Sequence, residues 1–179
     1  MNRLSMKVAG ILLLCCFCIA ASTYARAATR QLVDQTGVTI ELPEEPARVL
    51  ALAPSITEMI YSLGAEDRLV GATRYSNYPP AAGQLPKVGS YVQLDLEKIV
   101  ALKPDLCLAI KDGNPLRTVD AIKGFGVPVF AIDPRSIDQI KETFLLLGDI
   151  LGVEEKARDI VADMDRRLVA VKERVEASS

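Results

Sequence analysis

The sequence contains no histidine and no tryptophan among its 179 residues. Without histidine, the chain lacks the usual general base and the commonest metal ligand, and a Ser-His-Asp triad cannot form. Phosphate loops of the GxxxxGK type and GxSxG nucleophile elbows are also absent. The acidic residues are spread along predicted helix faces and do not cluster as metal ligands would. We therefore predict no catalytic residues and no metal site.

The N-terminus carries the features of an export signal. Arg3 and Lys7 precede the apolar run of residues 8–21, and residues 25–27 (Ala-Arg-Ala) offer small side chains where signal peptidase cleaves. We predict that residues 1–27 are a secretory signal peptide and that the mature protein lies outside the cytoplasm. A membrane anchor is the alternative, but the run is shorter than the ~20 apolar residues needed to span a bilayer.

Removal of this segment would leave Cys107 as the single cysteine, so no internal disulfide is expected. Cys15, Cys16 and Cys18 lie in the apolar run, but their bulky neighbours are a poor match to lipoprotein processing, so a lipid anchor is the weaker alternative. The segment also holds three of the 21 basic side chains and no acid, which leaves 18 basic against 23 acidic and a net charge of −5. This acidic balance argues against nucleic acid as a partner.

One stretch in the middle of the chain shows how the rest is organised. Asp95 can cap a helix in which apolar residues recur at helical spacing. Pro104 ends that helix and favours extended geometry at Lys103. The wholly apolar run at residues 106–110 is typical of a strand buried on both faces. The polar loop that follows, residues 111–114, lies at the edge where open α/β sheets bind ligands.

The remaining elements repeat this alternation of strand and helix. Ser55 with Glu58, and Ser136 with Gln139, match the capping box that opens a helix. The alternation predicts an α/β fold, with a parallel sheet and helices on both faces. The expected elements are a hairpin over residues 31–42, strands over 48–53, 69–72 and 127–132, and helices over 55–63, 116–124 and 136–151.

The last segment, residues 153–179, is predicted to be a long charged helix with one apolar stripe. At ~1.5 Å per residue such a helix spans most of a small domain. The predicted organisation is a signal peptide (1–27), an N-terminal α/β lobe (28–152) and a long interlobe helix (153–179). Because the chain stops without a closing strand, we expect that a second lobe is missing from this sequence.

Five motifs occur in an order that resembles a known family. They are RVLALAPSITE at residues 48–58, RYSNYPP at 74–80, VGSY at 88–91, LEKIVALKPDL at 96–106 and GN at 113–114. The chain resembles the periplasmic substrate-binding proteins of ABC importers for cobalamin, ferric siderophores and haem, and it is most similar to the cobalamin-binding members. The resemblance implies two α/β lobes joined by one rigid helix, a metal-chelate ligand clamped between them, and an ABC permease as the partner at the membrane.

The resemblance also carries over to single residues at the predicted ligand edge. Tyr75 and Tyr91 match aromatic positions that pack against a corrin ring, since a flat apolar macrocycle gains from aromatic faces. The cobalamin-type pattern has tryptophan where Tyr91 stands and another aromatic where Ile110 stands, which leaves ferric siderophore or haem as the alternative ligand. The full set of predicted ligand residues is Tyr75, Tyr91, Ile110, Lys111, Gly113 and Asn114.

Three charged residues receive further expectations from the resemblance. Glu97 matches the acidic residue of the first lobe that docks onto arginines of the permease. Arg74 and Arg117 could bind carboxylate or catecholate groups of a siderophore, or could simply be solvated surface. No cofactor is expected besides the ligand, which would be cobalamin or a ferric chelate. A secreted α/β enzyme of unknown reaction is the alternative from another class.

Overall fold

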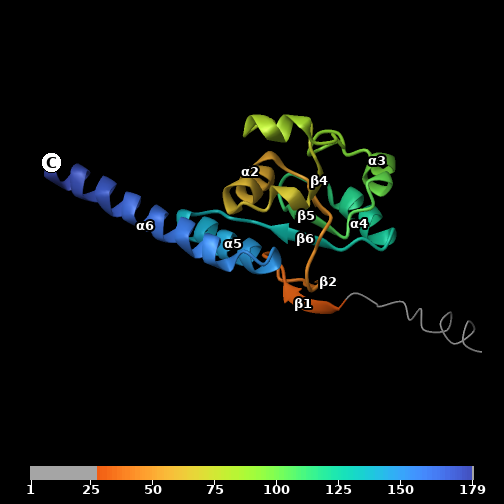
Figure 1. Ribbon diagram of the computed structural model, residues 1–179, viewed down its shortest axis with the longest axis horizontal. Helices are drawn as coiled ribbons and strands as arrows, with labels where there is room; N and C mark the ends of the chain where they lie inside the picture. Colours follow the sequence, from red (N-terminus) through yellow and green to blue (C-terminus); the bar gives the residue numbers. More distant parts are fainter. Residues whose placement is uncertain (1–27, 179) are drawn as a thin grey trace, which may run out of the picture.

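A parallel sheet forms the centre of the structure, a computed structural model that describes residues 28–178 (Figure 1). Within these residues the sheet has four strands in the order β4-β3-β5-β6, and every neighbouring pair is parallel. The α/β class is confirmed, while the predicted signal peptide lies outside the described residues. The strands are β3 (Val49–Ala51), β4 (Leu69–Ala72), β5 (Leu106–Ile110) and β6 (Val129–Ile132).

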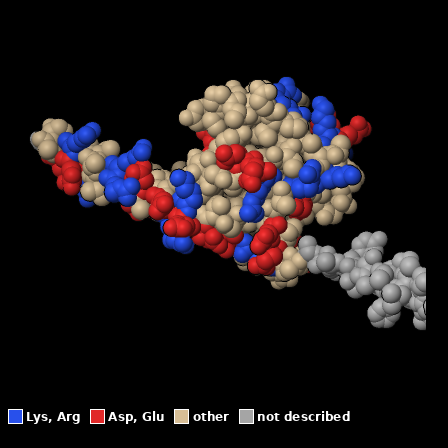
Figure 2. All heavy atoms as spheres, viewed as in Figure 1, with Lys and Arg blue, Asp and Glu red and all other residues tan. Residues whose placement is uncertain are grey.

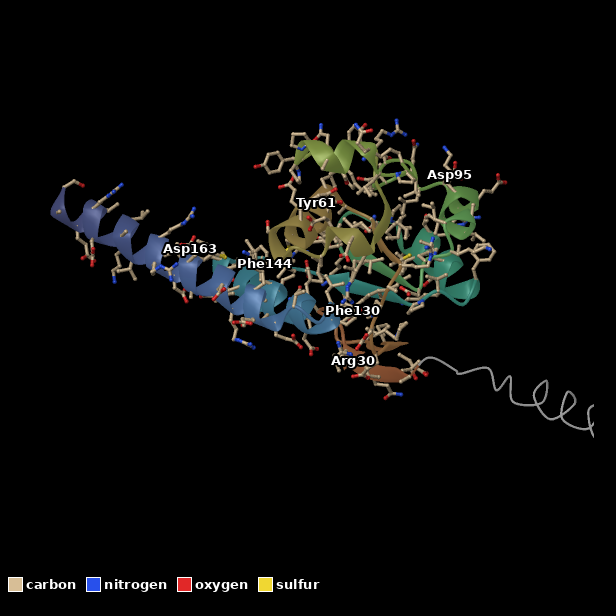
Figure 3. The ribbon with its side chains drawn as sticks, in the orientation of Figure 1. Arg30, Tyr61, Asp95, Phe130, Phe144 and Asp163 are labelled. Carbon is tan, nitrogen blue, oxygen red and sulfur yellow. The ribbon has the colours of Figure 1, made fainter. Side chains whose placement is uncertain are left out.

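Helices cover both faces of the sheet, because side chains alternate between the two faces along each strand. Leu50 and Val129 face one layer of helices, whereas Leu108 and Phe130 face the other (Figure 3 labels Phe130). The predicted arrangement with helices on both faces is therefore confirmed. The first layer is α3 (Leu96–Ala101) and α4 (Leu116–Gly124), and the second is α2 (Pro54–Leu63), α5 (Ile137–Ile150) and α6 (Glu154–Ala177); η1 (Glu66–Arg68) and η2 (Pro80–Gln84) are short turns of 3₁₀ helix.

Cys107 lies in β5 at the centre of the sheet and is fully buried, as its apolar neighbours predict. Burial, with a smaller contribution from the nearby Asp105 carboxylate, raises the pKa of its thiol to about 12. The thiol therefore stays protonated at neutral pH. It acts as a small apolar side chain in the core.

A hairpin covers the outer edge of β6. Its strands, β1 (Thr29–Val33) and β2 (Thr39–Pro43), pair antiparallel, and the turn between them lies along β6. The backbone N–H of Gln35 donates to the Ala131 carbonyl at 3.0 Å, and the Gln35 side chain accepts from the N–H of Asp133 at 2.7 Å. These bonds occupy polar groups of an edge strand that would otherwise be open to another chain.

Two of the predicted helix caps are present. The Asp95 carboxylate accepts a hydrogen bond from the N–H of Lys98 at 3.1 Å at the start of α3. The Ser136 hydroxyl accepts from the N–H of Gln139 at 3.2 Å at the start of α5. The Gln139 side chain reaches one residue further back than a capping box predicts, because it accepts from the N–H of Arg135. Each cap satisfies N–H groups that have no partner within the helix.

The predicted capping box at Ser55 and Glu58 is wrong. α2 begins at Pro54, its N-cap residue is Ala53, and no side chain caps it. Proline has no N–H to satisfy, and its φ suits the first helical position. The helix therefore starts one residue earlier, without a hydroxyl cap.

The extended geometry predicted for Lys103 is also wrong. Its φ is 47°, in the left-handed region. The Arg48 side chain donates to the carbonyl of Leu102 at 2.7 Å and to that of Lys103 at 3.0 Å. These long-range bonds hold the turn between α3 and β5, and they outweigh the local preference that Pro104 imposes on the preceding residue.

The long helix α6 is anchored near its start and extends beyond the rest of the lobe (Figure 1). Gly148 of α5 leaves room for Ala157 of α6, which is fully buried. The expected apolar stripe is buried only near this crossing, since Leu168 and Val171 are exposed. Acidic and basic side chains are mixed along the helix (Figure 2). No helix within the described residues is long and apolar enough to cross a membrane.

Substitution of Gly148 by alanine tests the crossing of α5 and α6. A methyl group at this position would overlap the Cβ of Ala157, so one helix must move. We expect Gly148→Ala to lower the free energy of unfolding by about 1–3 kcal/mol, the usual cost of overpacking. Urea denaturation measures this change.

The matched control is Gly124→Ala in α4, where an added Cβ meets no atom within 4 Å. That variant should change the free energy of unfolding by no more than about 0.5 kcal/mol. Equal stability of both variants would show that the two helices can separate without cost, contrary to the close contact seen here.

Candidate ligand-binding site

The carboxyl ends of the parallel strands meet at one edge of the sheet, and the loops there carry most of the predicted ligand residues. Residues 73–80 follow β4, residues 111–115 follow β5 and residues 133–136 follow β6. Residues 89–94 form a further loop that is hydrogen-bonded to the loop after β5. Open α/β sheets bind their ligands at this edge. We call it the ligand edge.

Asn114 holds three segments of the ligand edge together. Its side-chain oxygen accepts from the N–H of Ile110 at 2.8 Å. Its side-chain nitrogen donates to the carbonyl of Leu52 at 2.8 Å and to that of Tyr91 at 2.9 Å. The residue is only 6% exposed. Its amide is therefore occupied by protein atoms, and direct contact between Asn114 and a ligand stays a prediction.

The ring of Tyr91 lies against Gly113. A Cβ placed on Gly113 would be 3.2 Å from Cδ2 of Tyr91 and 2.7 Å from Cγ2 of Ile110, so only glycine fits beneath the ring without displacement. Tyr91 is 39% exposed, which leaves part of its side chain open to solvent. The structure thus brings together four of the six predicted ligand residues: Tyr91, Ile110, Gly113 and Asn114.

Tyr75 lies on the loop after β4, which buried hydroxyl groups hold in place. The Ser76 hydroxyl lies 3.0 Å from the Thr57 hydroxyl of α2 and 3.0 Å from that of Thr73. The Arg74 guanidinium carbon is 5.7 Å from the centre of the Tyr75 ring, within the range of a cation–π contact. Tyr75 itself is 54% exposed. A fixed backbone therefore presents an open aromatic ring.

Lys87 anchors the same loop from its other side. Its ammonium group donates to the carbonyl of Ser76 at 2.8 Å and to that of Ala82 at 2.7 Å. Burial lowers the pKa of Lys87 from its ordinary value. The sequence offered no signal for this role, because neither partner is a side chain and neither lies at a helical or strand spacing from Lys87.

Lys111 follows β5 directly, and its ammonium group pairs with Asp133 at 3.1 Å. Glu97 and Arg117 are exposed on α3 and α4. Among residues 28–178, no group of three or more His, Cys, Asp or Glu side chains could hold a metal ion. Ligand contact by Lys111 and permease docking by Glu97 stay predictions.

Two exposed apolar side chains on these loops and one at the start of α4 were not predicted from the sequence. They are Tyr78, Val92 and Leu116, and Leu116 is 72% exposed. Leu116 opens α4 and fits the apolar pattern of a helix, so its sequence position alone suggests core. Only the fold shows that its side chain is exposed at the ligand edge and not part of the core.

A groove of about 690 Å³ lies at the opposite edge of the sheet. Pro104, Val127 and Pro128, which precede β5 and β6, form one wall, and the hairpin with Val38 and Leu42 forms the other. None of the predicted ligand residues lines it. We favour the ligand edge as the site, because several loops converge there and parallel α/β sheets bind ligands at the carboxyl ends of their strands.

An open parallel sheet with exposed tyrosines at its carboxyl edge, followed by one long helix, defines a lobe of the ligand-binding α/β class. The family model described as "Periplasmic binding protein" matches residues 49–178. The chain belongs to this family, and the resemblance noted from its motifs is confirmed.

Known members of the family show how far the similarity extends. A vitamin B12-binding protein of Yersinia pestis is 38% identical over 136 residues, which are 75% of this chain and 49% of the relative. The crystal structure of a vitamin B12 binding protein of Vibrio cholerae has a TM-score of 0.68 at 31% identity, covering 74% of this chain and 52% of that one. A periplasmic heme binding protein of Pseudomonas aeruginosa has a TM-score of 0.70 at 31% identity, covering 74% and 48%. The chain spans about half the length of the curated relatives it matches.

Replacement of Asn114 by alanine tests its role in the ligand edge. The change would leave an N–H and two carbonyl groups without their side-chain partner. We expect Asn114→Ala to lower the free energy of unfolding by more than about 2 kcal/mol, because buried unsatisfied polar groups cost ~1–3 kcal/mol each.

Thermal and urea denaturation measure the effect, with Asn77→Ala as the control, since Asn77 is exposed on the loop after β4. If Asn114→Ala were as stable as Asn77→Ala, the three hydrogen bonds would not organise the site.

Proposed function

We propose that the protein is the periplasmic substrate-binding component of an ABC importer, which binds cobalamin and delivers it to a membrane permease. The observation that carries the proposal is the open Tyr91 ring, supported by Gly113 at the ligand edge of a periplasmic binding protein. The vitamin B12-binding relatives support cobalamin as the first choice of ligand. The relatives described above are binding proteins, which supports binding rather than catalysis.

The physical argument concerns the two open tyrosines. A corrin or porphyrin ring is flat and largely apolar, and it gains free energy by covering aromatic faces. Tyr75 and Tyr91 are both partly exposed. The backbone of each loop is held by a side chain, since Lys87 donates to the Ser76 carbonyl and Asn114 donates to the Tyr91 carbonyl. Because the loops are ordered before a ligand arrives, little conformational entropy is lost on binding.

Haem or a ferric siderophore is the second candidate ligand. Tyr91 and Ile110 replace the tryptophan and the second aromatic of the cobalamin-type pattern, so the apolar surface differs from that of a cobalamin site. The similarity to a heme binding protein, at 31% identity, supports this alternative. Calorimetric titration of the full-length protein, with the second lobe that the resemblance implies, separates cyanocobalamin, haemin and a ferric hydroxamate as candidates. Failure of all three to bind would contradict the proposal.

In the full-length protein, alanine at Tyr75 or Tyr91 should weaken binding of cyanocobalamin by about tenfold each, which corresponds to ~1.4 kcal/mol. The lost contact is aromatic surface that the ligand would cover. Since both rings are open, the melting temperature should change by less than about 3 °C. Calorimetry and thermal denaturation of the same samples measure the two effects.

The matched control is Phe125→Ala. Phe125 is an exposed aromatic at the end of α4, next to the groove at the opposite edge. Phe125→Ala should leave the affinity for cyanocobalamin unchanged. A large fall in melting temperature for the tyrosine variants, without a specific loss of affinity, would assign both rings to the core instead.

Glu97→Ala should leave ligand affinity unchanged but impair transport through the cognate permease. Charge pairs at the edge of an interface steer association and determine register, and Glu97 is exposed at the start of α3. The defect should grow with salt, because the remaining pairs are then screened. Uptake assays at low and high salt, alongside a binding titration, measure both quantities.

Glu155→Ala provides the control, since Glu155 is also an exposed acid in the first turn of a helix. Both variants lose the same favourable interaction with a helix dipole. Normal uptake by the Glu97 variant at both salt concentrations would show that Glu97 only stabilises the N-terminus of α3 through its charge.

A further inference from the structure

Four charged side chains form one ion-pair network at the ligand edge, which we call the charged rim: Lys111, Asp112, Asp133 and Arg135. Lys111 directly follows β5 and Asp133 directly follows β6. The Asp133 carboxylate lies 3.1 Å from Nζ of Lys111 and 2.5 Å from Nε of Arg135. Arg135 also pairs, through its terminal nitrogen, with the Asp112 carboxylate. The rim therefore links the loop after β5 to the loop after β6.

The two acids of the charged rim have different surroundings. The side chain of Asp133 is only 14% exposed and contacts both cations. Burial acts to raise the pKa of Asp133, but hydrogen bonds from Arg135 and Lys111 outweigh it, and the pKa lies below its ordinary value. The side chain of Asp112 is 62% exposed and pairs with Arg135 alone among the described contacts. Asp133 is thus the fixed partner and Asp112 the replaceable one.

Replacement of Asp112 by another anion costs little free energy. Ion pairs between exposed side chains contribute a median of only about 0–1 kcal/mol, since water already solvates both groups. The Arg135 side chain is about half exposed, so an incoming group can reach it. A guanidinium group donates in a planar fork that fits a carboxylate or a phosphate, whichever molecule supplies it.

The charged rim lies immediately beside the surface on which a ligand would rest. Asp112 precedes Gly113, and Gly113 supports the ring of Tyr91. A flat ligand that covers Tyr91 therefore places its own edge near Arg135. Lys111, also about half exposed, adds a second cation to the same side.

We propose that the charged rim is an anion subsite, in which Asp112 occupies Arg135 until an acidic group of the ligand replaces it. The subsite selects metal chelates that carry a carboxylate or a phosphate on their periphery. This inference rests on the proposed function and narrows it to a chemical class of ligand. It also assigns Arg135 a role in specificity, although no sequence motif pointed to this residue.

Three probes distinguish the sources of the anion. Haemin carries two carboxylates, cyanocobalamin carries one phosphodiester, and cobinamide is a corrin that lacks this phosphodiester. Each is titrated into the full-length protein, with the second lobe that the resemblance implies, and into its Arg135→Gln and Asp112→Asn variants. The matched control is Arg166→Gln, which removes a similarly exposed ion pair with Asp163 on α6. Thermal denaturation shows that each variant is folded.

We expect Arg135→Gln to weaken the binding of haemin, of cyanocobalamin or of both by about tenfold. The affinity for cobinamide should change by less than about twofold, and Arg166→Gln should have no effect. Asp112→Asn should tighten binding of the same acidic probe by about threefold, because a competing carboxylate is gone. A response to haemin alone assigns the anion to carboxylates, and a response to cyanocobalamin alone assigns it to phosphate.

Two results would overturn the anion subsite alone. One is that Arg135→Gln lowers the affinity by the same factor for every probe that binds. The rim would then only support the structure of the ligand edge. The other is weaker or unchanged binding of acidic probes by Asp112→Asn. Absence of binding of all three probes by the unaltered full-length protein would instead overturn the proposed function, and the subsite with it.

Discussion

The buried amide of Asn114 is the interaction on which the ligand edge depends. It binds backbone groups at the end of β3, at the end of β5 and in the loop that carries Tyr91. Polar groups buried without a partner cost about as much free energy as a lost hydrogen bond. The three segments are therefore held in one arrangement, and the position of the Tyr91 ring over Gly113 follows from it.

The second tyrosine is positioned by separate chemistry. The loop that carries Tyr75 is held by the buried hydroxyl of Ser76 on one side and by the ammonium group of Lys87 on the other. Neither anchor involves Asn114. The two aromatic surfaces of the ligand edge thus have different side-chain anchors, and the charged rim lies beside one of them. The backbone N–H of Arg74 also donates to the Gly89 carbonyl at 2.7 Å, which joins the loop of Tyr75 to the loop of Tyr91.

Sequence patterns predicted the elements well where a single local force decides them. The apolar run of β5 predicted a buried strand, and Asp95 could satisfy an N–H in the first turn of α3 without a partner from elsewhere. The same reasoning failed where two forces compete. Proline at position 54 displaced the expected cap at Ser55, and the side chain of Arg48 imposed a left-handed turn on Lys103.

By itself, the sequence determined the α/β class, the order of strands and helices, and membership of the family, because these depend on apolar periodicity, turn residues and motifs that are read along the chain. Only the tertiary structure decided which side chains meet at the ligand edge. Asn114 bonds to Leu52 across 62 positions, and Arg135 pairs with Asp112 across 23. No local spacing encodes such contacts, since they form only when parallel strands bring the ends of separate loops to one edge of the sheet.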